Sequence, residues 1–169
     1  GCAGAEPNPS NQLLYSNGQT SRRGKNLHWP FPTRECKRIE VYYALAGGSK
    51  GIGYWWFRKG PWANGVAART PDALELWKEI GLCGNEIKTA RDLIVRSTPV
   101  NVAITPNSQW IWAKAVASGI DSMILYIVND NYWNDINGCH VTNVPNAGVT
   151  ITLPAWMQPS PMAFEVTAG

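Results

Sequence analysis

Tryptophan is the residue type in this chain whose number points most directly to a chemistry. Nine of the 169 residues are tryptophan. The indole ring is large and flat, and its N–H needs a hydrogen-bond partner when the ring is buried. Such enrichment is common in proteins whose aromatic rings stack on the flat faces of sugars. For any single tryptophan, packing in a core or in a domain interface is the simpler explanation.

The histidines and serines do not form a recognisable catalytic motif. His28 and His140 fall in separate predicted loops and have no serine or cysteine nucleophile pattern near them. Ser49 lies in a Gly-Ser-Lys-Gly turn, which has neither the spacing of a nucleophile elbow nor that of a phosphate-binding loop. Neither chemistry is therefore predicted.

Metal binding is not predicted either. The segment 129–138 is rich in Asn and Asp and resembles a calcium loop, but its acids do not fit the EF-hand positions and no Glu closes it. A long polar hairpin loop is the preferred interpretation. The four cysteines, at positions 2, 36, 83 and 139, include no C-x-x-C pair, so the spacing of a zinc site is absent. Cys36 and Cys83 lie on the apolar faces of predicted helices and are expected to be buried free thiols. No metal ion and no organic cofactor are expected.

Charge and hydropathy exclude two classes of partner. The net charge is +3, from 15 basic and 12 acidic residues. The basic cluster Arg22, Arg23 and Lys25 lies in a stretch rich in Gly, Ser and Asn, which predicts a solvated loop and not a nucleic-acid interface. No run of 18 apolar residues occurs, so no membrane contact is predicted. The compartment stays open, with secretion or a periplasmic location as candidates.

The first half of the chain predicts an α/β unit. Residues 7–32 hold many Pro, Gly, Asn and Ser and predict one long loop. Thr33 is a good N-cap for a helix over residues 34–46, which has one apolar face, and Gly47-Gly48 can end that helix. Residues 51–57 form a continuous apolar run, typical of a strand that is buried on both faces. A helix, a glycine turn and a buried strand make a unit of a parallel sheet.

A second, longer helix is predicted over residues 71–94. Thr70 is its expected N-cap, and Pro71 suits the first helical position. Gly81 and Gly84 lie inside this helix and cost about 1 kcal/mol each relative to Ala. Close approach of a neighbouring element is expected to explain them.

After residue 97 the hydrophobic period changes from that of a helix to that of a strand. Strands are predicted over residues 100–105, 109–117, 122–128, 148–153 and 162–166, with a hairpin turn at 118–121. Short strands without intervening helices indicate an antiparallel sandwich. The predicted fold is α+β, with a partial, barrel-derived α/β unit at 1–97 followed by a β-sandwich-like domain at 98–169.

The segment 32–57 resembles a known family. Its Pro-Thr-Arg-Glu helix start and its Ala-Leu-Ala-Gly-Gly-Ser-Lys-Gly-Ile-Gly-Tyr run are similar to the seventh helix and eighth strand of the (β/α)8 barrel in clan A glycoside hydrolases, particularly β-galactosidase-like bacterial proteins. The Leu-Trp-Lys-Glu-Ile-Gly run after residue 75 resembles the eighth helix, and the β-rich tail resembles the sandwich that follows such barrels. The resemblance implies a carbohydrate-active protein that, in its complete form, hydrolyses glycosidic bonds of an oligosaccharide or polysaccharide by carboxylate acid/base chemistry.

The resemblance also implies candidate site residues. Retaining hydrolysis needs two carboxylates about 5 Å apart at the C-terminal ends of the barrel strands. Glu6 matches the position of the nucleophile after the seventh strand, and a simple loop carboxylate is the alternative. Trp55 or Trp56 matches the aromatic residue that floors the sugar subsite at the end of the eighth strand, with core packing as the alternative.

The size of the chain leaves its activity open. A complete barrel needs about 250 residues, so this chain supplies only the last elements of one. It opens on Gly-Cys-Ala-Gly-Ala, which suits neither a signal peptide nor a mature start, and it is expected to be part of a longer chain. The alternative function is a non-catalytic carbohydrate-binding domain or a structural accessory domain. A second carboxylate within about 10 Å of Glu6 would favour the hydrolase.

Overall fold

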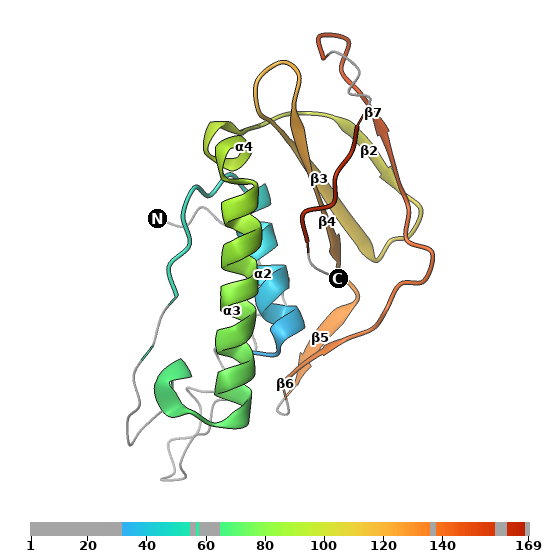
Figure 1. The fold of residues 1–169 in the computed structure, drawn as a ribbon. Helices are drawn as coiled ribbons and strands as arrows, with labels where there is room; N and C mark the ends of the chain where they lie inside the picture. The colour runs from blue at the N-terminus through green and yellow to red at the C-terminus, as the bar shows by residue number, and fades with distance from the viewer. Residues whose placement is uncertain (1–31, 55–56, 58–64, 136–137, 158–161, 168–169) are drawn as a thin grey trace, which may run out of the picture.

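A computed structural model describes residues 32–54, 57, 65–135, 138–157 and 162–167. These residues combine helices with antiparallel sheets, so the α+β class is confirmed, while neither a barrel nor a sandwich is (Figure 1). No described helix combines the length and the apolar character needed to cross a membrane.

The first described helix, α2, spans Arg34–Ala46, as predicted. The Thr33 side chain caps it by accepting a hydrogen bond from the Cys36 N–H at 3.3 Å. Gly48 follows the helix with a φ of +96°, and its N–H donates to the Leu45 carbonyl at 2.9 Å. This is the left-handed glycine cap that the sequence predicted, because a side chain is disfavoured at this backbone conformation.

The predicted helix over residues 71–94 is two helices. Helix α3 spans Pro71–Thr89 and α4 spans Arg91–Arg96, and Ala90 between them leaves helical geometry at φ −93° and ψ 8°. The break turns the last six residues and buries Ile94 in the core. Pro71 lies at the start of α3 as expected, but Thr70 makes no side-chain cap hydrogen bond.

Gly81 and Gly84 of α3 were expected to allow close approach of a neighbouring element, and this prediction is wrong. A Cβ atom built on Gly81 or Gly84 would meet nothing within 4 Å, and both residues are exposed. No described element approaches this face of the helix closely, so the two glycines are not needed for packing within the described part of the chain.

The prediction of a buried strand over residues 51–57 is also wrong, as far as these residues are described. Residues 51–54 and Phe57 have no regular secondary structure, and the Phe57 side chain is 62% exposed. A strand buried on both faces needs paired neighbours and covering layers, and the described residues contain no parallel strand that could pair here. Trp55 and Trp56 lie outside the described residues.

The main sheet of the described chain has the order β1-β3-β4 and is antiparallel. Its long strands are β3, Ile111–Ala117, and β4, Met123–Asn129, and β1 contributes only Thr98–Pro99. The predicted turn joins β3 to β4: Gly119 has a φ of +85°, and the Ser118 N–H donates to the Ser122 carbonyl at 2.8 Å.

Two shorter antiparallel pairs complete the described sheets. Strand β2, Ala103–Pro106, pairs with β7, Val149–Thr152, where strands were predicted. Strand β5, Tyr132–Asp135, pairs with β6, Gly138–Val141, in the region predicted as a polar hairpin loop. The strand predicted at 162–166 does not form, and no helix occurs among the described residues after 97.

The helices cover one face of the β3–β4 sheet (Figure 1). The main core cluster contains residues from α2, α3, α4, β3 and β4: Val41, Leu45, Ala46, Cys83, Ile94, Val116 and Tyr126. Residues from both sides of position 97 therefore share one core. The division of the chain at that position stays a prediction.

The expectation for the cysteines is half right. Cys83 is fully buried and free. Cys36 is buried but forms a disulfide with Cys139 on β6, with their Cα atoms 6.3 Å apart. The apolar face that was expected to bury Cys36 as a thiol faces the β5–β6 hairpin, which the sequence did not place next to α2.

Candidate functional site

The residues predicted to cleave or hold a sugar cannot be placed in this fold. Glu6, Trp55 and Trp56 lie outside the described residues. Their described neighbours Tyr54 and Phe57 are exposed, and the Phe57 ring lies 5.6 Å from the Trp77 ring on α3. The candidate groups that the structure does describe are the other aromatic and ionisable side chains.

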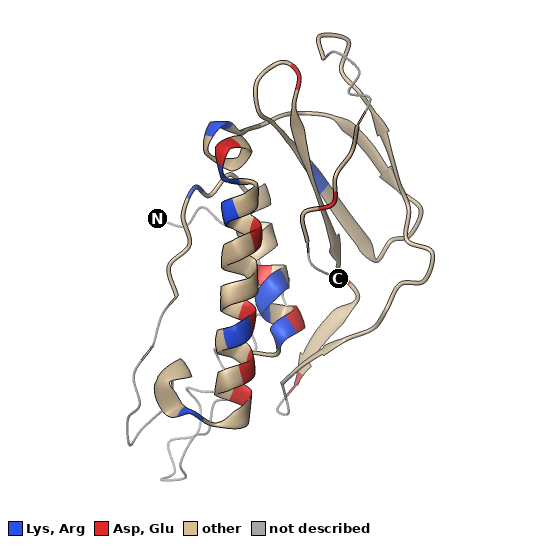
Figure 2. Cartoon of the chain, viewed as in Figure 1, with Lys and Arg blue, Asp and Glu red and all other residues tan. Residues whose placement is uncertain are grey.

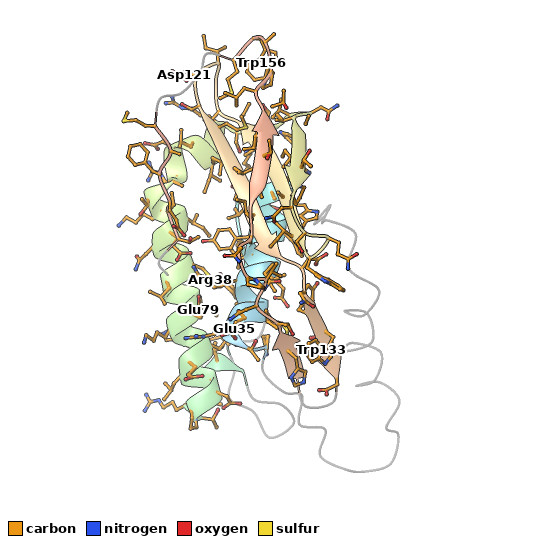
Figure 3. The ribbon with its side chains drawn as sticks, turned by 90° about the vertical axis from the view of Figure 1, so that its right-hand side faces the viewer. Glu35, Arg38, Glu79, Asp121, Trp133 and Trp156 are labelled. Atoms are coloured by element: carbon orange, nitrogen blue, oxygen red, sulfur yellow. A yellow bond between two sulfur atoms is a disulfide. The ribbon has the colours of Figure 1, made fainter. Side chains whose placement is uncertain are left out.

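The exposed tryptophans of the described chain lie on different elements. They are Trp77 on α3, Trp110 before β3, Trp133 on β5 and Trp156 after β7. They do not form one stacking platform, because Trp133 and Trp156 lie at opposite ends of the molecule (Figure 3). Among the described residues, Trp133 is the exposed tryptophan whose ring stacks on a polar side chain.

The stacked pair lies across the β5–β6 hairpin. Trp133 is the register partner of His140, and their ring centroids are 5.1 Å apart with planes inclined by 18°. His140 Nε2 lies 3.0 Å from Asp135 Oδ1. Trp133 and Asp135 are two residues apart on one strand, so the three side chains share one face of the hairpin. An aromatic ring, an imidazole and a carboxylate therefore meet on a solvent-facing surface.

Trp133 keeps part of its surface accessible to solvent. The imidazole of His140 stacks on its ring, yet the residue is 49% exposed. The flat apolar face of a pyranose can stack on such an indole surface, while Asp135 can accept hydrogen bonds from sugar hydroxyls. A site of this kind offers stacking and polar contacts to a sugar.

The opposite face of the hairpin fixes it to helix α2. Tyr132 and Cys139 are buried in a cluster with Cys36 and Ile39. The Cys36–Cys139 disulfide closes this contact covalently. The stacking face therefore stands on a packed and crosslinked base, which lowers the entropy lost when a ligand binds.

Further hydrogen bonds hold the entry to the hairpin. The Tyr43 hydroxyl donates to Asp130 Oδ1 at 2.5 Å, and Asn129 Nδ2 donates to the Thr142 carbonyl at 2.8 Å. Burial, followed by the bond to Asp130, raises the pKa of Tyr43, so this hydroxyl stays protonated as a donor.

A second cluster of ionisable groups lies buried between α2 and α3. Arg38 donates from one guanidinium nitrogen to Glu79 and from the other to Glu86, at 2.6 Å for Glu86. The Tyr42 hydroxyl also donates to Glu86. Residues 79 and 86 lie two turns apart on one face of α3, and residues 38 and 42 lie one turn apart on α2. Figure 3 shows Arg38 directed toward α3 beside Glu79.

The electrostatics of this cluster are those of a closed ion-pair network. Burial disfavours the charge of Arg38, but the bonds to Glu79 and Glu86 outweigh it and raise the pKa of the guanidinium. Burial and then the bond to Glu86 raise the pKa of Tyr42. Both carboxylates are bound by the same cation, so the cluster ties α2 to α3.

Cys83 adjoins the same network without being reactive. Its sulfur lies 3.9 Å from Glu79 Oε1. Burial, against the smaller effect of Arg38, raises the pKa of this thiol to about 11. A thiol of this kind is protonated near neutral pH and is a poor nucleophile.

The described residues contain no group of three His, Cys, Asp or Glu side chains placed to hold a metal ion. In the Asn- and Asp-rich segment, Asp130 binds Tyr43 and Asp135 binds His140. The acids of that segment therefore serve the hairpin and its anchor.

Comparison with known proteins adds no assignment. No family model, curated protein or solved structure matches this chain.

Sequence reasoning missed the Trp133, Asp135 and His140 constellation for a definable reason. His140 was assigned to a loop, and pairing it with Trp133 requires the register of the β5–β6 hairpin. The available signal was the Tyr-Trp pair followed by the Asn137-Gly138 dipeptide, a sequence typical of a short hairpin.

Proposed function

We propose that this chain binds carbohydrate, and that the Trp133, Asp135 and His140 face of the β5–β6 hairpin holds a sugar ring. The observation that carries the proposal is a half-exposed tryptophan whose ring stacks on His140, with the Asp135 carboxylate 3.0 Å from the imidazole. The enrichment in tryptophan and the family resemblance support the same ligand class. One stacked ring with few polar contacts should give binding in the millimolar range.

A titration with soluble neutral oligosaccharides, followed by the NMR signals of the indole N–H groups, tests this proposal. The Trp133 signal is expected to shift with saturation at millimolar ligand, and Trp133→Ala is expected to weaken binding at least about tenfold. Trp156→Ala is the matched control, because Trp156 is equally exposed at the other end of the molecule and should leave binding unchanged. Binding that survives Trp133→Ala would place the sugar site elsewhere.

We further propose, as the second candidate, that the complete protein is a glycoside hydrolase related to clan A, with Glu6 as nucleophile and Trp55 or Trp56 in the sugar subsite. The support is the resemblance of residues 32–57 and of the following helix to the last barrel elements of that family. Hydrolysis also needs a paired acid, which the family takes from the fourth strand of the barrel. The 169-residue chain is therefore expected to be inactive or weakly active by itself.

Aryl glycosides test the second candidate. Turnover by the isolated chain is expected to be negligible, and Glu6→Gln is expected to change nothing measurable. Robust turnover that Glu6→Gln abolishes would make this chain a complete small glycosidase. Robust turnover that ignores the substitution would mean that the nucleophile is another residue.

A further inference from the structure

Strand β4 has an open outer edge within the described chain. It lies at the end of the β1-β3-β4 order, with β3 on its inner side. The Ser118 N–H bonds the Ser122 carbonyl, and the Asp130 N–H bonds the Trp110 carbonyl, so both ends of the ladder are hydrogen-bonded pairs. Hydrogen-bonded and non-hydrogen-bonded pairs alternate along an antiparallel ladder. The backbone N–H and C=O groups of the even-numbered residues of β4 therefore point toward β3.

The odd-numbered residues of β4 therefore direct their N–H and C=O groups outward. They are Met123, Leu125, Ile127 and Asn129. No backbone hydrogen bond joins these groups to another described residue. The strand contains no charged residue and no proline, and Figure 2 shows that the charges gather mainly on the helices. Exposed apolar edges of this kind are normally covered, because they invite pairing with another strand.

The C-terminal segment 162–167 lies beside this edge. Figure 1 shows it running down the molecule in the same direction as β4, and Figure 3 shows it between α3 and the sheet. Thr167 lines an open cavity of about 250 Å³ together with Ile127, Val128 and Asn129 of β4 and with Arg38, Ile39 and Tyr42 of α2. The segment thus reaches the outer edge without being a strand.

The side chains of this segment alternate as those of a strand do. Met162, Phe164 and Val166 are apolar and occupy every second position, and Phe164 is 79% exposed. With Thr167 on the side of α2, these three side chains fall on the other face of the sheet. Ile127 lies on that face and is 51% exposed. Pairing would therefore bring apolar side chains together on both strands.

We propose that residues 162–167 dock on the outer edge of β4 as a parallel fourth strand, which gives the sheet order β1-β3-β4-C-terminus. The docked strand satisfies the outward N–H and C=O groups of β4 and covers Ile127 with Phe164 and Val166. It also closes the cavity above Arg38 and Tyr42. The occupant is the chain's own C-terminal segment, since Thr167 already lies at the edge that it would complete.

Residue-resolved amide hydrogen exchange of the whole chain tests the docking. The outward N–H groups of Leu125 and Ile127 are expected to exchange at least tenfold more slowly in the whole chain than in a chain shortened after residue 161. The inward N–H groups of Tyr126 and Val128 are the internal control and should stay protected in both chains, which shows that the sheet is intact.

A substitution separates docking from a general effect of truncation. Val166→Asp is expected to reduce the protection of Leu125 and Ile127 by at least tenfold, whereas Val166→Ile should retain it. Equal exchange of the outward amides in the whole and shortened chains would overturn the proposal. Protection that rises with protein concentration would overturn it as well, because a second copy would then occupy the edge.

Discussion

At the scale of single residues, the charges between α2 and α3 decide how the helices fit together. Glu79 and Glu86 are buried, and a buried carboxylate is costly unless a partner compensates it. Arg38 compensates both, and Tyr42 satisfies a further oxygen of Glu86. Among the described residues, Arg38 is the cation that pairs with both carboxylates.

Replacing that cation should be strongly destabilising. Arg38→Met leaves two buried carboxylates without their shared partner, and it is expected to lower the free energy of unfolding by about 3–5 kcal/mol. Urea unfolding measures the change. Arg34→Met is the control, because Arg34 pairs with Glu35 in water and its loss should leave stability nearly unchanged. Similar effects of the two substitutions would show that the buried network contributes no more than a surface pair.

Cys83 should make the protein sensitive to alkaline pH. Its pKa is about 11 in the folded chain against 9.0 without the fold, because burial disfavours the thiolate. The unfolded chain therefore loses this proton first as the pH rises, and stability is expected to fall between about pH 9 and 11. Thermal unfolding across this range measures the loss, and Cys83→Ala should flatten the pH profile. If stability falls with pH as steeply in Cys83→Ala as in the original chain, other groups cause the alkaline loss of stability. Tyr126 is one such group, because burial raises its pKa to about 12.

At the scale of elements, helix α3 contains two interior glycines that lower its stability and that no described packing contact requires. Glycine in a helix interior loses more backbone freedom than alanine does, and no described atom lies within 4 Å of a Cβ built on Gly81 or Gly84. Gly81→Ala and Gly84→Ala are each expected to raise the free energy of unfolding by about 1 kcal/mol. Thermal unfolding measures the gain.

The same substitution at Gly48 is expected to have the opposite effect on stability. It ends α2 at a φ of +96°, where alanine is strained, so Gly48→Ala should destabilise the chain by about 1 kcal/mol. A loss of stability on Gly84→Ala would indicate that a partner packs closely on the exposed face of α3.

At the scale of the whole molecule, one covalent bond joins the first described helix to the β-rich part of the chain. Cys36 and Cys139 are separated by 103 residues, and closing so long a loop removes much of the entropy of the unfolded chain. Cys36→Ala is expected to lower the free energy of unfolding by about 2–5 kcal/mol. Denaturant unfolding with and without dithiothreitol measures it, and the reductant should have no further effect on the variant.

Thiol titration of the denatured, unreduced protein checks the bond itself. Cys36 and Cys139 should be unreactive, and Cys83 should react once the fold is lost. Reaction of all three would return Cys36 to the free state that its apolar helix face suggested.

Features that depend on neighbouring residues along the chain could be predicted from the sequence. The start of α2 at Thr33, its end at Gly48 and the hairpin turn around Gly119 follow from hydrogen bonds between residues at most a few positions apart. The α+β class follows from the change of hydrophobic period near residue 97. The burial of Cys83 follows from its place on the apolar stripe of α3.

Contacts between distant segments could not be predicted in this way, because they depend on the tertiary fold. The pairing of Arg38 with Glu86 and of Cys36 with Cys139 joins residues that no local pattern brings together. Residues 51–54 belong to an apolar run suited to a buried strand, yet no described strand pairs with them. Trp133 stacks on His140 because the register of the β5–β6 hairpin places them opposite each other. Local propensity sets an element's type and ends, whereas pairing and burial depend on which distant segments are present to complete them.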